Sequence, residues 1–114
     1  MRELLAIPQT HAFVAEGGKG FALIREVKGE AEILTLAVRE DHRRQGIGEA
    51  LVAAMRGWAT QCGIKVIFLE VRERNAAAQA LYAKAGFAVI SKRKAYYHNR
   101  DGSTENAVIL RCRG

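Results

Sequence analysis

The chain has 114 residues, of which 49% are hydrophobic and 26% are charged, a composition that is ordinary for one folded domain with a sizeable core. It excludes a disordered chain and predicts a single domain over residues 1–114. The formal net charge of +6 favours an anionic partner, such as a phosphorylated cofactor, an acidic peptide, a ribosomal surface or nucleic acid, without choosing among them.

No apolar run approaches the roughly 20 residues that span a bilayer, and the first residues lack a secretory pattern. We therefore expect a cytoplasmic protein with no membrane partner. Cys62 and Cys112 lie far apart in the sequence and have no CxxC or CxxxH partner, so neither a zinc site nor a disulfide framework is predicted.

Periodicity and turn signals divide the chain into short elements. A glycine-rich connection follows the first strand, and a more apolar segment after Gly29 is predicted to be a central strand buried on both faces. Apolar positions then recur every three or four residues from Ile47 to Cys62, which predicts an amphipathic helix that stops at Gly63. A second helix begins at an Asn75 cap and ends before Gly86. The predicted elements are strands 11–16, 20–27 and 31–39, helix 47–62, strand 65–71, helix 75–85, and strands 88–97 and 106–112.

This order predicts a mixed α/β sheet with helices packed on its faces. The loop that opens the first helix, Arg43-Arg44-Gln45-Gly46-Ile47-Gly48, is the most informative segment. Unpaired N–H groups at a helix start attract a phosphate, the two glycines permit close approach, and the two arginines add donors. Taken alone, the segment is better explained as an ordinary glycine turn with two solvated arginines. It lacks the P-loop and dinucleotide-fold patterns, so ATP and NAD are poorly supported.

The motif Arg43-x-x-Gly46-x-Gly48 resembles the acetyl-CoA loop of GNAT acetyltransferases. The later run from Asn75-Ala76-Ala77-Ala78 through Leu81-Tyr82 to Gly86-Phe87 extends the likeness. It is most similar to the bacterial ribosomal-protein alanine N-acetyltransferases (RimI type), over about residues 10–112. The resemblance implies a GNAT-like, mostly antiparallel central sheet whose N-terminal strand and helices are truncated.

That truncation is expected to leave residues 1–7 as a helix remnant ended by Pro8. In the family, the elements that precede this point form one wall of the acceptor groove. A more open groove, or one completed by a second subunit, is therefore expected here, and the second alternative predicts a homodimer.

The resemblance further implies acetyl-CoA as co-substrate and no metal. The backbone of residues 36–38 would pair with the pantetheine arm, and the N–H groups of residues 44–49 would face the pyrophosphate. Asn75 would also contact the cofactor, although a helix N-cap explains it equally well and both roles can coexist. The implied cofactor-binding residues are Leu36, Ala37, Val38, Arg43, Arg44, Gln45, Gly46, Ile47, Gly48, Glu49 and Asn75.

Two proton movements accompany amine acetylation, and the resemblance places Glu70 and Tyr82 at the family positions for them. Glu70 would act as general base toward an amine whose pKa is near 8, and Tyr82 would act as general acid toward the departing thiol. The alternatives are an exposed charge paired with Arg72 or Lys65 for Glu70, and aromatic core packing for Tyr82, with Leu81 as the other candidate for the core.

The predicted function is acetyl transfer from acetyl-CoA to a primary amine, most specifically the N-terminal α-amino group of a protein such as a ribosomal protein. A small-molecule amine and a non-catalytic acyl-CoA-binding module are the alternatives. Nucleic-acid binding rests on charge alone and is not expected beyond proximity to the ribosome. Of Tyr96 and Tyr97, only one is expected to line the acceptor groove, because neighbouring strand residues face opposite sides. The basic cluster Lys92, Arg93, Lys94 and Arg100 is equally a solvated face or a surface for an acidic partner.

Overall fold

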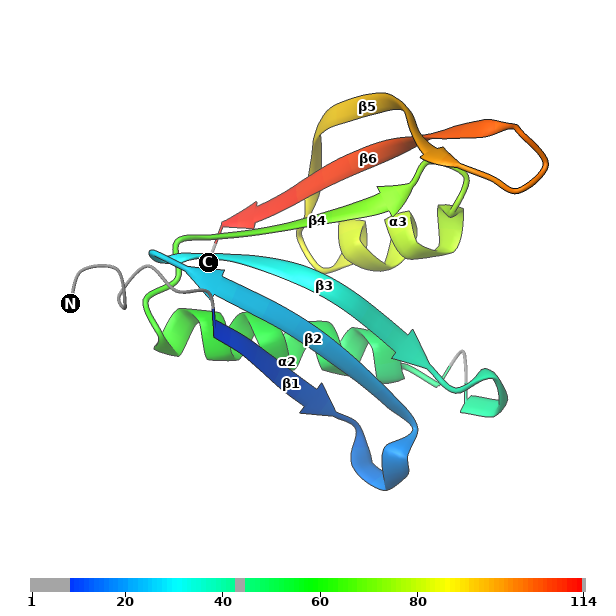
Figure 1. Cartoon of the computed structure of the whole chain (residues 1–114). Coiled ribbons are helices and arrows are strands. Elements are labelled where there is room, and N and C mark those ends of the chain that lie inside the picture. Colours follow the sequence, from blue (N-terminus) through cyan, green and yellow to red (C-terminus); the bar gives the residue numbers. More distant parts are fainter. Residues whose placement is uncertain (1–8, 43–44, 114) are drawn as a thin grey trace.

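The computed structural model describes residues 9–42 and 45–113, so the remnant helix expected before Pro8 lies outside the described residues. Within these described residues, six strands form one sheet in the order β1-β2-β3-β4-β6-β5 (Figure 1). The elements are β1 (Gln9–Val14), η1 (Glu16–Gly18), β2 (Gly20–Val27), β3 (Glu30–Val38), η2 (Glu40–His42), α2 (Ile47–Gln61), β4 (Val66–Arg72), α3 (Ala76–Lys84), β5 (Ala88–His98) and β6 (Thr104–Arg113).

Every pairing in this sheet is antiparallel except the one between β3 and β4. Parallel neighbours need a long crossover, and α2 supplies it. The mixed, mostly antiparallel sheet predicted from the sequence is therefore confirmed, and the predicted elements match the observed ones with small shifts at their ends.

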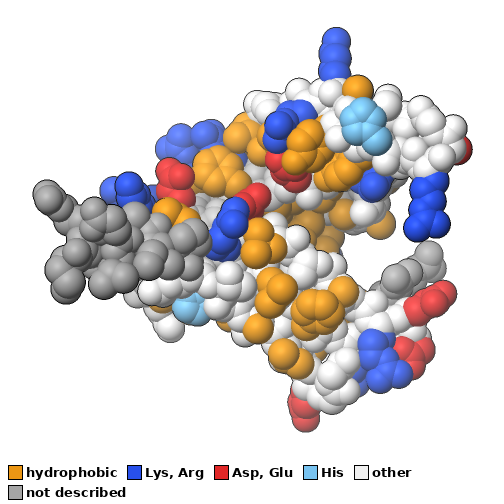
Figure 2. All heavy atoms as spheres, in the orientation of Figure 1, with side chains coloured by type: hydrophobic (Ala, Val, Ile, Leu, Met, Phe, Trp, Pro, Cys, Tyr) orange, Lys and Arg blue, Asp and Glu red, His pale blue; other side chains and the backbone are white. Residues whose placement is uncertain are grey.

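The two α-helices in the described part of the chain, α2 and α3, pack on one face of the sheet and share one core. α2 buries Leu51, Val52, Met55 and Ala59, and Tyr82 of α3 belongs to the same cluster. Figure 2 shows the opposite face, where hydrophobic side chains gather over β2 and β3. The prediction that the third strand is buried on both faces is wrong, because no described helix covers this second face and Leu34 is 43% exposed there.

The end of α2 explains the abrupt turn into β4. Gly63 has φ of +72°, a left-handed conformation that glycine adopts without strain. Its N–H donates to the Thr60 carbonyl at 3.2 Å, and the Ile64 N–H donates to the Ala59 carbonyl at 2.9 Å. This is a Schellman motif, whose hydrophobic residue after the glycine is the buried Ile64. The predicted glycine stop is therefore confirmed.

The start of β2 depends on close approach of two backbones. A Cβ on Gly20 would lie 2.8 Å from the carbonyl oxygen of Ala37, whereas a Cβ on Gly57 of α2 would meet nothing within 4 Å. We expect Gly20→Ala to destabilise the fold by about 1–3 kcal/mol, and the matched Gly57→Ala to stabilise it by up to about 1 kcal/mol, because glycine is costly inside a helix. Urea unfolding of both variants measures the difference. Equal free energies of unfolding would show that the β2–β3 approach tolerates a side chain.

Candidate cofactor and catalytic site

The sheet splits between β3 and β4. The two strands pair only where Glu30–Glu32 face Val66–Phe68, and Figure 1 shows them diverging beyond that point. From there β4 pairs with β6 and β3 pairs with β2. The edge of β3 that faces the split therefore keeps backbone N–H and C=O groups without a strand partner, which an extended ligand can bind as an added strand does.

A groove of about 600 Å³ lies along this free edge and ends at the first turn of α2. Seven of the eleven cofactor-binding residues expected from the sequence line it: Leu36, Ala37, Val38, Gly46, Ile47, Gly48 and Glu49. Gln45 is exposed and is not part of the lining. Arg43 and Arg44 lie outside the described residues, so their part in the site stays a prediction.

The end of the groove is suited to an anion. Gly46 is the N-cap of α2, with φ of +77° and no side chain bonded to the helix start. The first intrahelical bond runs from the Ala50 N–H to the Gly46 carbonyl at 3.0 Å, so the preceding N–H groups have no intrahelical acceptor. A Cβ on Gly48 would come 3.3 Å from Leu81 Cδ2. The left-handed conformation at the first position favours glycine, and a Cβ at the second would require the Leu81 side chain to shift.

The far wall of the groove comes from α3 and was not predicted. This wall consists of Ala77, Ala78 and Leu81 of α3. The groove lining also includes His42 of η2. Asn75 is not in the lining, and its Oδ1 accepts the Ala78 N–H at 3.0 Å, so the helix-cap interpretation is confirmed and its cofactor contact stays a prediction. The N-A-A-A motif was the available signal, because small residues at a helix start permit close approach of a ligand.

Glu70 projects from β4 on the face opposite the helices, since its neighbours Leu69 and Val71 are buried in the core. Its Oε1 lies 3.2 Å from Arg93 Nη1, and the Glu70 side chain is 25% exposed. The Arg93 guanidinium in turn lies 4.2 Å from the centre of the Tyr96 ring. The carboxylate is therefore ion-paired and accessible, and its partner is Arg93 rather than Arg72 or Lys65.

Tyr96 and Tyr97 lie on the same side, and the expectation that they face opposite sides is wrong. Their ring centroids are 5.1 Å apart in an edge-to-face arrangement. The β5–β6 register shifts between Arg93 and Tyr97, and Ala95 has φ of +52°. This bulge cancels the alternation of the strand. Burial, followed by the charge of Glu70, raises the pKa of Tyr97 above its ordinary value.

Tyr82 belongs to the core, whereas the adjacent Leu81 lines the groove. The Tyr82 side chain is 5% exposed, and its ring meets Phe87 edge to face at 5.5 Å. Burial raises the pKa of Tyr82 to about 12. The hydroxyl therefore stays protonated at neutral pH and acts there only as a neutral donor or acceptor. Neither Tyr82 nor Glu70 lines the 600 Å³ groove, so the structure brings the cofactor-binding residues together and leaves the role of these two a prediction.

Comparison with known proteins settles the family. A family model described as the acetyltransferase (GNAT) family matches residues 2–87. The chain belongs to the GNAT family. It is 41% identical over 90 residues to a [ribosomal protein bS18]-alanine N-acetyltransferase of Haemophilus ducreyi, covering 79% of this chain and 62% of that protein. It is 38% identical over 99 residues to the Escherichia coli K12 protein of the same name, covering 85% and 66%.

Solved acetyltransferase structures share the fold of this chain. The ribosomal-protein-S18-alanine N-acetyltransferase of Escherichia coli superposes with a TM-score of 0.82 at 34% identity, over 93% of this chain and 68% of that one. An acetyltransferase of Bacillus anthracis, solved in complex with acetyl coenzyme A, has the same fold with a TM-score of 0.83 at 24% identity, over 95% of this chain and 64% of that one. The chain spans a little under two thirds of the length of its two curated relatives.

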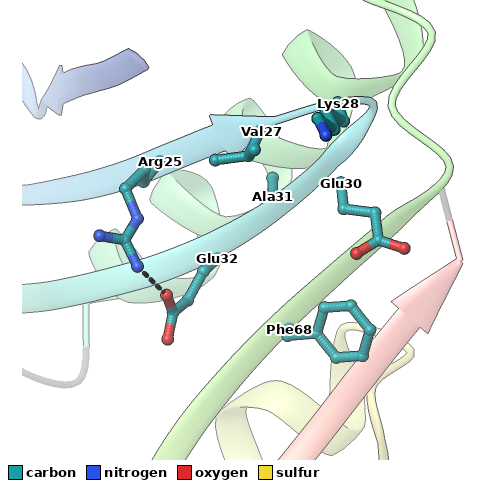
Figure 3. Close-up of a pocket in the computed structure, with 7 residues that line it drawn as sticks. All are labelled: Arg25, Val27, Lys28, Glu30, Ala31, Glu32 and Phe68. Atoms are coloured by element: carbon teal, nitrogen blue, oxygen red, sulfur yellow. Dashed lines mark hydrogen bonds and ion pairs between the residues drawn. The ribbon is translucent and has the colours of Figure 1, made fainter. Parts of the chain in front are cut away.

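A second hollow in this GNAT domain lies at the closed end of the split, shown in Figure 3, with a volume of about 550 Å³. An ion pair of 2.8 Å joins Arg25 and Glu32 at its edge, and Phe68 of β4 closes one side. Among the described residues, it shares none with the groove at α2, and none of those predicted for the site line it.

In the basic cluster of the GNAT domain, two of the four cations form ion pairs with carboxylates of the same chain. Arg93 pairs with Glu70, and Lys92 pairs with Glu73, which lowers the pKa of the Glu73 carboxyl. Among the described residues, Lys94 and Arg100 have no carboxylate within ion-pair distance. Both interpretations of this cluster, a solvated face and a surface for an acidic partner, stay predictions. Within the same described part of the chain, no group of three or more His, Cys, Asp or Glu residues could hold a metal ion, and no helix is long and apolar enough to cross a membrane.

Proposed function

We propose that this GNAT domain transfers the acetyl group of acetyl-CoA to a primary amine, most specifically the N-terminal α-amino group of a ribosomal protein in the cytoplasm. The observation that carries the proposal is the groove that opens where β3 leaves β4 and ends at the uncapped first turn of α2. The two curated relatives, whose names specify alanine of ribosomal protein bS18, favour this acceptor class.

The groove residues fit acetyl-CoA along its length. Residues 36–38 offer a free strand edge to the amide-containing pantetheine arm, which is the geometry of strand addition. The N–H groups at the start of α2 face the pyrophosphate, and the positive end of the helix dipole stabilises its charge. Acetyl-CoA supplies the activated acetyl thioester, and the chain positions it.

Glu70 accepts the proton that the acceptor ammonium must lose before it attacks. The carboxylate already pairs with one cation, Arg93, so an incoming ammonium replaces or joins a partner of the same charge. Its exposure on the face opposite the helices leaves it open to an acceptor. General-base catalysis of this kind contributes about 10²–10⁴-fold.

Tyr82 acts on the departing sulfur as a hydrogen-bond donor. With a pKa of about 12, against about 8.5 for a thiol, complete proton transfer from its hydroxyl is unfavourable by roughly 5 kcal/mol, since each pKa unit is about 1.4 kcal/mol. A hydrogen bond to the developing thiolate stabilises charge without that cost. This role is narrower than the general acid expected from the sequence.

Tyr82→Phe tests this role because it removes one hydroxyl and keeps the ring that packs on Phe87. We expect kcat to fall by at least about 10-fold, with acetyl-CoA affinity unchanged, which is the signature of an interaction made in the transition state. Single-turnover kinetics with saturating acceptor measure it. Wild-type turnover in the folded variant would remove Tyr82 from the mechanism.

The stability of Tyr82→Phe at alkaline pH tests the burial of the Tyr82 hydroxyl independently of enzyme activity. A tyrosine ionises near pH 10 in the unfolded chain and near 12 when buried here. Its contribution to stability is thus complete below pH 10 and is lost as pH rises toward 12, by about 1.4 kcal/mol per pH unit. The free energy of unfolding should therefore fall less steeply above pH 10 in Tyr82→Phe than in the wild type.

A panel of acceptors scored by released CoA tests the function itself. Peptides that begin with alanine or serine, including the N-terminus of bS18, are compared with polyamines, amino acids and aminoglycoside-type antibiotics. The proposal expects the peptides to give the highest kcat/KM. A higher kcat/KM for a small amine would show that the acceptor is a small molecule and not a protein N-terminus. Binding of acetyl-CoA without turnover on any amine would indicate a non-catalytic module. The homodimer stays a prediction.

A further inference from the structure

The two edge strands of the described sheet, β1 and β5 (Figure 1), differ in composition. β5 carries three consecutive cations, Lys92, Arg93 and Lys94, and a bulge at Ala95. Charged side chains and bulges keep an edge strand from pairing with another chain. β1 contains no Lys, Arg, Asp, Glu or Pro, and its register with β2 is uninterrupted. The edge at β1 is therefore the one suited to accept a further strand.

The backbone of β1 shows which groups are open at this edge. The Ala15 N–H donates to the Gly20 carbonyl at 2.8 Å, and the antiparallel register continues from there through β1. In such a pair every second residue bonds to the neighbouring strand, and the residues between point their N–H and C=O groups the other way. The groups of Thr10, Ala12 and Val14 therefore point away from β2. Among the described residues, no strand pairs with them.

The side chains around this edge leave it accessible. His11 and Phe13 contact Trp58 of α2, so the residues that alternate with them lie on the face opposite the helices. These alternate residues are exposed, and Val14 is 68% exposed. On the helix side, a hollow of about 280 Å³ lies between the end of β1 and α2. Neither side of the edge is filled by the described residues at this point.

A second copy of the same strand fits this edge. When two β1 strands run antiparallel about a twofold axis at Ala12, Thr10 of each copy faces Val14 of the other, and Ala12 faces its own counterpart. Each of the three residues whose groups point outward then meets another such residue, and the two members of each pair exchange N–H···O bonds. Val14, whose neighbour within the sheet is Phe21, gains a second cross-strand neighbour. Such an interface is self-complementary and closed.

We propose that this protein forms a homodimer in which the outer edge of β1 pairs with β1 of a second copy, antiparallel about a twofold axis at Ala12. β2 and β3 separate β1 from the split that forms the acetyl-CoA groove, so the second copy adds no residue to the groove. The inference therefore does not depend on the proposed function. One pair of six-residue strands is a small interface, so the dimer should dissociate on dilution.

Cysteine cross-linking tests the register of this pairing. A Cys62→Ser background removes the exposed native thiol. In this background Ala12→Cys should be joined efficiently by a short bismaleimide, since paired Cα atoms lie about 5.5 Å apart. Thr10→Cys is the matched control, because its counterpart is displaced by four residues, or about 13 Å, and it should be linked at least about 10-fold more slowly. Mixing Thr10→Cys with Val14→Cys should restore rapid linking. Equal rates for Ala12→Cys and Thr10→Cys alone would overturn the register.

Ala12→Pro tests the pairing itself. It removes an N–H that points out of the sheet, and edge strands tolerate proline at such positions. Light scattering at high protein concentration should show a dimer for the wild type and a monomer for the variant. Ala12→Lys, which places like charges opposite each other, should also be monomeric and serves if the proline variant does not fold. Ala88→Lys adds the same charge to the other edge strand and should remain dimeric.

The remaining outcomes decide whether the inference holds. A wild type that stays monomeric at high concentration, or a dimer that persists in folded Ala12→Pro and Ala12→Lys, would overturn it. Acetyl transfer should be unchanged in the monomeric variants. Loss of acetyl transfer together with the dimer would show that the second copy contributes to the catalytic site, and would contradict its placement at β1. A dimeric wild type without acetyl transfer would overturn the proposed function alone.

Discussion

Glu70→Gln is expected to lower kcat by about 10²–10⁴-fold at pH 7 and by much less at pH 9. The amide keeps the size of the side chain and can no longer take up a proton. An α-amino group with a pKa near 8 is mostly an ammonium at pH 7 and mostly a free amine at pH 9, so the variant should recover as the solvent deprotonates the acceptor. Steady-state kinetics across this pH range, with saturating acetyl-CoA, measure the effect.

Glu32→Gln is the matched control for this experiment. Glu32 is also a strand carboxylate ion-paired with an arginine, at 2.8 Å from Arg25, and it lies outside the acetyl-CoA groove. Its loss should leave the pH dependence of kcat unchanged. An equal loss of activity in Glu70→Gln at pH 7 and pH 9 would contradict the base assignment and indicate that Glu70 only positions the acceptor.

Gly46→Asp should weaken acetyl-CoA binding about 10- to 100-fold more than Gly46→Asn does. Aspartate and asparagine have the same shape, and both tolerate the left-handed conformation better than other side chains, which φ of +77° requires here. The pair therefore differs by one negative charge at the start of α2. That charge repels the pyrophosphate by about 1.4–2.7 kcal/mol, which lies between the values for two unit charges 4 Å apart in water and near a protein surface.

Calorimetry at low and high salt completes this comparison, because screening should narrow the difference between the two variants. Thermal melting of both proteins shows whether the fold is kept. Equal affinities of the Asp and Asn variants for acetyl-CoA would place the pyrophosphate elsewhere and remove the start of α2 from the site.

Local signals predicted most of the fold. The three- and four-residue period from Ile47 onward, the Gly63 stop and the Asn75 cap each correspond to an observed bond or turn. The glycine loop at the start of α2 is likewise found in the groove. These features are local because each depends on a few neighbouring residues and the conformations they allow.

Features that depend on packing between distant segments could not be predicted from such local signals. The bulge that brings Tyr96 and Tyr97 together depends on Ala95, whose N–H donates to Asn106 Oδ1 of the neighbouring strand at 2.9 Å, and alanine carries no signal for a left-handed conformation. Helical periodicity alone also left open which of Leu81 and Tyr82 faces the core. In the structure, Tyr82 packs in the core and Leu81 lines the groove.

The most direct test of the central claim is to locate the acetyl group on an acceptor. A peptide with the bS18 N-terminal sequence, a free α-amine and an added internal lysine is incubated with acetyl-CoA and the protein, and tandem mass spectrometry locates the modification. We expect acetylation of the α-amine, strongly reduced with Glu70→Gln at neutral pH. An unmodified peptide, or acetylation confined to the lysine side chain, would contradict it.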